Sequence, residues 1–150
     1  MQYNFYGWKE SLNVHAIDNT YRGIKTPCDL YDSLLNIWCE YSCTSRLRAY
    51  WDESNITLGQ CSITSFLAQD IFGGQVFGIL RPEGGIHCYN VVNDHVFDLT
   101  SEQFGGEQLD YSLSHNQEQT RAIHFANDEK RQRYEYIKSE LERLTSRMKS

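Results

Sequence analysis

The sequence predicts an α+β fold with one small antiparallel sheet set among helices. Three observations predict it. Apolar residues recur at helical spacing in three segments, and three short strand-like runs follow one another with turn residues between them. No long crossover separates these runs, as a parallel sheet would require. The length of 150 residues fits a single domain that buries its core without disulfides.

Composition limits the function classes. The net charge of −6 disfavours nucleic acid as a partner. No apolar run approaches the length of a membrane span, and the first residues lack the pattern of a secretory signal. We therefore expect a cytoplasmic protein that binds no membrane. Its partner or substrate is an unidentified protein, peptide or amide, and the sequence leaves its oligomeric state open.

The chain divides into an N-terminal arm and one α+β domain. Residues 1–27 are aromatic and polar without a sustained period, so we expect an irregular or partly disordered arm. The domain covers 28–150. Its first helix is predicted over 29–42, with Asp29 as the N-cap, and residues 43–58 form a long polar connection.

The rest of the domain begins with a buried helix over 61–72, which Gly73-Gly74 ends. Strands are predicted over 75–80, 86–92 and 95–100, with Asn93-Asp94 as the turn between the last two. Residues 101–125 are loop-like. A charged helix with a narrow apolar stripe is predicted over 128–148.

Cys61 opens the predicted buried helix. The positive end of the helix dipole and the unpaired N–H groups of the first turn favour a thiolate there. The same N–H groups can stabilise an oxyanion when that thiolate attacks a carbonyl. A core cysteine at a helix start is the alternative interpretation.

The predicted hairpin supplies a base and an acid. A two-residue turn at Asn93-Asp94 sets Val92 opposite His95, and pleating then puts His87 and Asp98 on one face as diagonal neighbours, roughly 7 Å apart between Cβ atoms. A carboxylate at that position can hold the imidazole in one tautomer and support its charged form. If this face packs near the start of the Cys61 helix, the three residues form a Cys–His–Asp triad. Asn90 is the alternative orienter.

Several motifs in order carry a family resemblance. They are Gly59-Gln60-Cys61, Gln69-Asp70, Phe72-Gly73-Gly74, His87, Asn90, the run Asp98 to Phe104, and the Arg131 to Tyr134 stretch of the last helix. Over about residues 30–140 the chain resembles the uncharacterised bacterial YunG-like proteins. The wider resemblance is to a compact papain-like or transglutaminase-like cysteine core, in which a cysteine at a helix start meets a histidine and an acid on antiparallel strands.

The leading hypothesis is a thiol enzyme that acts on an amide or ester carbonyl through a thioester, as a peptidase, deamidase or transamidase. Cys61 is its nucleophile, His87 its general base and acid, and Asp98 the orienting residue. Two alternatives stay open. The fold can serve as a non-catalytic interaction or adaptor module, or Cys61 can be a redox-sensing thiol.

Further residues are assigned supporting roles. Gln60 either donates to the oxyanion or packs against a neighbouring segment, Asn90 supports the structure from the opposite face, and Trp51 either walls the cleft or lies in the core. No two of Cys28, Cys39 and Cys43 have the spacing of a zinc knuckle, so we expect no metal and no cofactor. Cys88 is expected to be buried on the face opposite His87.

Overall fold

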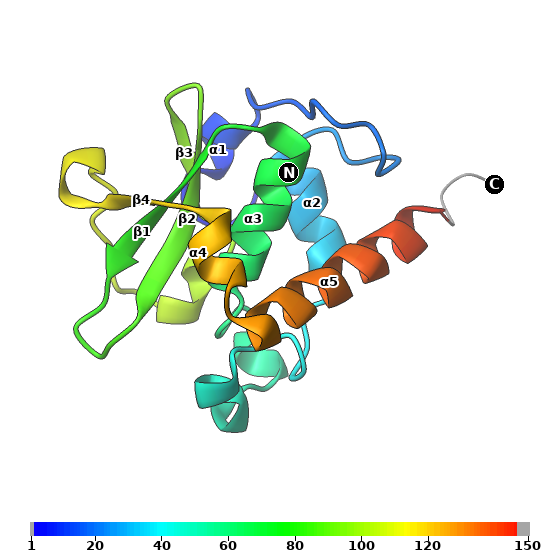
Figure 1. Cartoon of the computed structure of the whole chain (residues 1–150). Helices are drawn as coiled ribbons and strands as arrows, with labels where there is room; N and C mark the ends of the chain where they lie inside the picture. The colour runs from blue at the N-terminus through cyan, green and yellow to red at the C-terminus, as the bar shows by residue number, and fades with distance from the viewer. Residues whose placement is uncertain (1, 147–150) are drawn as a thin grey trace.

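A computed structural model describes residues 2–146 and has the predicted α+β class. A four-stranded antiparallel sheet packs against the central helix α3 (Cys61–Phe72), and α2 (Pro27–Leu34) and α5 (Asp128–Ser146) cover the other side of that helix (Figure 1). The strand order is β3-β2-β1-β4. The sheet, α3 and the outer helices thus form three successive layers.

Helix α3 has the predicted bounds, and nine of its twelve residues are buried. Its side chains Ile63, Phe66, Leu67 and Ile71 are all inaccessible to solvent, so the predicted face lies in the core. Gly73 ends the helix with φ of 80°, a left-handed backbone that glycine adopts at no steric cost.

Helix α2 is shorter than predicted and begins earlier. Thr26 is its N-cap, and Asp29 stands at the third helical position, where its carboxylate accepts the Thr26 N–H at 3.0 Å. This capping box replaces the expected N-cap at Asp29. The helix ends at Leu34. The apolar residues Ile37 and Trp38 lie beyond it in irregular chain, but their side chains are still buried.

The sheet matches the predicted strands closely. Strands β1 (Gln75–Leu80) and β2 (Ile86–Val92) have the predicted bounds, and β3 (His95–Phe97) is shorter because the chain leaves the sheet at Asp98. Val92 pairs with His95, as the turn predicted, since Asn93 and Asp94 both have positive φ, as a type I′ turn requires. The prediction missed β4 (Gln117–Gln119), a short polar strand on the edge of β1.

The N-terminal segment contains little regular structure, but it is part of the core. One short helix, α1 (Trp8–Ser11), lies in it. Four apolar side chains of the segment are buried: Phe5, Val14, Tyr21 and Ile24. Tyr6 bridges to Asp98, and Gly7 lies so close to the Val96 carbonyl that a Cβ there would stand 2.0 Å from the oxygen. The segment therefore packs along the free edge of β3.

The C-terminal part closes the core. Helix α5 begins at Asp128 as predicted, and residues 147–148 of its predicted span lie outside the described residues. The short α4 (Arg121–Phe125) precedes it, and the 3₁₀ turns are Ser45–Tyr50, Glu53–Asn55, Ser101–Phe104 and Leu113–His115. Among residues 2–146, no helix combines the length and apolar character needed to cross a membrane.

Candidate active site

Cys61 is the first residue of α3 and is partly exposed. The loop before it turns at Gly59, whose φ is 70° and where a Cβ would stand 2.5 Å from the Cys43 sulfur. Glycine is therefore required for the chain to enter the helix at this point. The N–H groups of the first turn of a helix have no intrahelical acceptor, so they remain available beside the thiol.

His87 and Asp98 form a buried pair. The His87 Nε2 lies 2.6 Å from Asp98 Oδ2, and the two side chains are 2% and 1% exposed. Asp98 also accepts the Tyr111 hydroxyl at 2.7 Å through Oδ2 and the Thr100 N–H at 3.1 Å through Oδ1. These bonds hold the carboxylate facing the imidazole, as the predicted register implied.

The helix packs on the face of the sheet opposite His87. Asn90 donates from Nδ2 to the Ser65 carbonyl of α3 at 2.9 Å, and Cys88 belongs to the same core cluster as α3. The His87 face instead carries a second cluster that includes Tyr89. The condition set for the triad, that the His87 face packs near the start of the helix, is therefore not met through the face of the sheet.

Cys61 nevertheless reaches His87 at the edge of the sheet. The β3 ladder begins only at Asn90, so the first residues of β2 have no partner on that side. The Cys61 sulfur lies 3.8 Å from the Ile86 carbonyl oxygen, the residue before His87. The His87 Nδ1 is buried and has no hydrogen-bond partner among residues 2–146, so it is the ring nitrogen left for the Cys61 thiol.

The electrostatics favour an ion pair between Cys61 and His87. Hydrogen bonding from Cys88 and then from His87 lowers the pKa of Cys61 well below its usual range, although burial opposes this. Burial lowers the pKa of His87, but Asp98 and Cys61 outweigh it and raise that pKa to about 10. Both shifts favour a thiolate facing an imidazolium over a neutral pair.

Cys88 is the neighbour of Cys61 that the sequence did not indicate. It is buried, as expected. Hydrogen bonding with Cys61 and burial raise the pKa of Cys88, and the same contact lowers the pKa of Cys61. Strand alternation correctly placed Cys88 on the face opposite His87, but it could not show that α3 packs there and brings Cys61 within reach of both faces.

The supporting residues have mostly structural contacts. The Gln60 amide is fully buried and donates to the Cys39 carbonyl at 3.1 Å, while its amide oxygen, an acceptor, is left without a partner. Of the two interpretations, packing against a neighbouring segment describes Gln60. The Trp51 indole donates to the Ile56 carbonyl at 3.0 Å and does not line the cavity at Cys61.

A cavity of about 320 Å³ opens at Cys61. Phe104 forms the aromatic part of the cavity wall. Its ring contacts the His87 ring edge-on, with 4.7 Å between the ring centroids. The lining residues come from four parts of the chain: the 44–47 segment, the start of α3, the turn between β1 and β2, and the 103–104 turn, with Lys130 from α5. Phe104, rather than Trp51, is thus the aromatic residue of the cleft.

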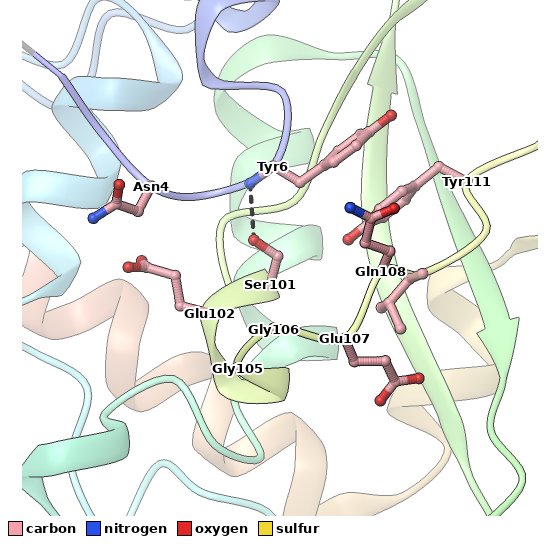
Figure 2. A pocket seen from close by; sticks show the side chains of 10 residues that line it. Asn4, Tyr6, Ser101, Glu102, Gly105, Gly106, Glu107, Gln108 and Tyr111 are labelled. Carbon is pink, nitrogen blue, oxygen red and sulfur yellow. Dashed lines mark hydrogen bonds between the residues drawn. The ribbon is translucent and has the colours of Figure 1, made fainter.

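A second, larger cavity of about 720 Å³ lies behind Asp98. Figure 2 shows the Tyr6 and Tyr111 rings beside each other at its wall, with Glu102 and Glu107 around it. The two rings stack at 3.9 Å between centroids. Since Tyr111 donates to Asp98, this stack joins the N-terminal segment to the acid of the candidate site.

Among residues 2–146, no group of three or more histidine, cysteine, aspartate or glutamate side chains could hold a metal ion.

A family model described as "YunG protein" matches residues 26–146. The chain belongs to the YunG family. The uncharacterized protein YunG of Bacillus subtilis (strain 168) is 44% identical over 54 residues, which are 36% of this chain and 46% of that protein. The match thus spans about half the length of the relative. No solved structure matches this YunG-family chain.

Proposed function

We propose that this YunG-family protein is a thiol enzyme that acts on an amide or ester carbonyl. The single observation that carries the proposal is the buried His87, which bonds Asp98 through Nε2 and keeps Nδ1 free for the Cys61 thiolate. An oriented histidine beside a thiolate at a helix start is the arrangement that nucleophilic catalysis requires. We extend the proposal to the fold, as a compact papain-like or transglutaminase-like core.

The proposed reaction has two steps, acylation of Cys61 and release of the acyl group. The Cys61 sulfur bonds to the substrate carbonyl carbon, the oxyanion is stabilised by the N–H groups at the start of α3, and His87 gives the Nδ1 proton to the departing amine or alcohol. In the second step His87 takes a proton from water or an amine, which displaces the thiolate. Asp98 keeps the Nε2–H oriented throughout. The products are an acid or a new amide and the released amine or alcohol.

The test is acylation by 4-nitrophenyl acetate. We expect a rapid burst of nitrophenolate and a mass gain of one acetyl group, mapped to the Cys61 peptide. Cys61→Ala must abolish both, and Cys39→Ala, which removes another partly exposed thiol, must leave both unchanged. An acetyl group distributed over several cysteines, or no burst, contradicts the proposal and favours the interaction or adaptor module.

A redox role is the second candidate, and the contact between Cys61 and Cys88 favours it. A peroxide would oxidise the Cys61 thiolate to a sulfenic acid and be reduced to water or an alcohol, and the Cys88 thiol would then displace water to form a disulfide. Treatment with hydrogen peroxide distinguishes the two candidates. A Cys61–Cys88 disulfide found by peptide mapping, together with no acetyl adduct, would support redox sensing over acyl transfer.

A further inference from the structure

The cavity at Cys61 is basic, although the chain as a whole carries a net charge of −6. Three cationic side chains line it, Arg46, Arg81 and Lys130, against one acidic side chain, Glu83. Which of these charges is free to act on a ligand depends on their partners within the protein.

Arg81 is fully occupied. Its guanidinium bonds Glu83 at 3.0 Å and Glu107 at 2.9 Å, and it lies over the Phe104 ring at 4.5 Å. The one acidic side chain of the lining, Glu83, is therefore ion-paired with Arg81. Within residues 2–146 the remaining positive charges, on Arg46 and Lys130, form no ion pair with a carboxylate of the cavity wall, although Arg46 acts on Glu83 at longer range.

Arg46 reaches over the turn between β1 and β2. Its Nη2 lies 2.7 Å from the point where a Cβ on Gly85 would stand, so the glycine makes room for the guanidinium. Within residues 2–146, no carboxylate lies within 4.0 Å of the Arg46 nitrogens in an ion pair. Arg46 thus spans from the 45–50 turn to the hairpin with its charge unpaired.

Lys130 faces a neutral partner. Its Nζ lies 2.9 Å from Nδ1 of His124, and burial together with the Lys130 charge lowers the pKa of His124. A neutral imidazole accepts one of the three ammonium hydrogens and contributes no negative charge. In the described part of the chain Lys130 forms no salt bridge.

We propose that Arg46 and Lys130 form an anion site beside Cys61, so that the substrate carries a carboxylate near the carbonyl that Cys61 attacks. Both cationic side chains line the same cavity as Cys61 and His87. The proposal rests on the proposed function and names its substrate class: an acidic peptide or another carboxylate-bearing amide or ester.

Two alkylating reagents that differ in charge test this directly. Iodoacetate carries a carboxylate, iodoacetamide is neutral, and each transfers its carbon to sulfur with loss of iodide. The measured quantity is the ratio of their rate constants at Cys61, divided by the same ratio for free cysteine. We expect this normalised ratio to exceed one and to fall by about threefold to fivefold in Arg46→Gln and in Lys130→Gln.

Matched variants control for net charge. Arg22→Gln and Lys25→Gln each remove one exposed positive charge that does not line the cavity, and both must leave the ratio unchanged. Added salt must reduce the ratio of the native protein. A normalised ratio of one or less overturns the anion site. A ratio that stays unchanged in both Arg46→Gln and Lys130→Gln overturns it as well.

The design separates this proposal from the enzyme proposal. Labelling by iodoacetamide at pH 6 reports only whether Cys61 is a thiolate. The charge ratio is measured again at pH 8.5, where ordinary thiols are half ionised. Slow iodoacetamide labelling at pH 6, together with a normalised ratio above one at pH 8.5, would refute the activated thiol and support the anion site.

Discussion

His87→Gln removes the positive charge that faces the Cys61 thiolate while keeping an N–H that can bond Asp98. Glutamine is the first choice because His87→Ala would leave the buried Asp98 carboxylate without its 2.6 Å partner and risk unfolding the chain. We expect the variant to fold and to lose much of the acidity of Cys61. The consequence is a change in how thiol reactivity depends on pH.

The expected magnitude follows from the ionised fractions. An ordinary thiol with pKa near 8.5 is about 0.3% thiolate at pH 6, whereas hydrogen bonding from Cys88 and then His87 lowers the pKa of Cys61 and raises its ionised fraction there. Nucleophilicity falls by about threefold for each tenfold gain in acidity. The ionised fractions can differ by at most about 300-fold, and the lower nucleophilicity of a more acidic thiol offsets part of this advantage. The variant keeps Cys88 and the helix start, so it should lose the share of the advantage that His87 contributes and keep the rest.

The shape of the profile is more decisive than the rate. In the native protein the labelling rate of Cys61 should be nearly constant from pH 6 to 9 and change only as His87 loses its proton near pH 10. In His87→Gln it should rise with pH like an ordinary titration. Restricted access of the reagent lowers the labelling rate by the same factor at every pH, so it does not move the midpoint of the profile.

The assay is iodoacetamide labelling from pH 5 to 10, read for each cysteine by peptide mass spectrometry. Cys39, which is also partly exposed, serves as the internal comparator. His95→Ala is the matched control, since His95 bonds Glu10 on the surface and does not line the cavity at Cys61. A native Cys61 profile that rises in step with Cys39, or one that His87→Gln leaves flat, refutes the ion pair and with it the enzyme proposal.

Three further expectations concern the surroundings of the site. Gly7→Ala should lower the free energy of unfolding by at least about 1–3 kcal/mol, because its Cβ would stand 2.0 Å from a carbonyl oxygen, whereas Gly106→Ala, with nothing within 4 Å, should have no effect in the same urea titration. Tyr111→Phe removes a hydroxyl that bonds Asp98 and should cost about 1.5–3 kcal/mol by the same measurement; an unchanged midpoint would contradict this role. Trp51→Phe should leave the pH profile of thiol labelling unaltered, because the indole lies outside the cavity.

The parts of the structure that the sequence predicted are those set by local chemistry. Apolar spacing and the Gly73 stop fixed the bounds of α3. The Asn93-Asp94 turn fixed the register of β2 and β3, because its two positive φ angles allow one pairing of the flanking residues. The approach of His87 to Asp98 was predicted from this register, although Asp98 itself lies one residue beyond the end of β3. Each of these inferences needed only residues close together in the chain.

The parts that the sequence did not predict depend on packing between distant segments. The choice of which sheet face α3 covers is decided by the core partners of Cys88 and Asn90, and strand alternation is the same for either choice. The short strand β4 is polar and is paired only through the edge of β1, so no hydrophobic alternation marks it. The burial of Phe5 likewise depends on aromatic contacts, such as its 4.9 Å contact with Tyr31, that no local period reveals.

The N-terminal segment changes how the candidate site should be approached experimentally. An irregular arm over residues 1–27, as the sequence predicts, would be dispensable and could be deleted as a control. The structure instead bonds the Asp98 N–H to the Tyr6 carbonyl at 2.9 Å and stacks Tyr6 on Tyr111, which donates to the Asp98 carboxylate. Removing the segment would therefore withdraw contacts from the acid that orients His87, and expose core side chains at the same time. Reactivity of a truncated chain would report on a damaged site, so point substitutions in the full chain are the sound test.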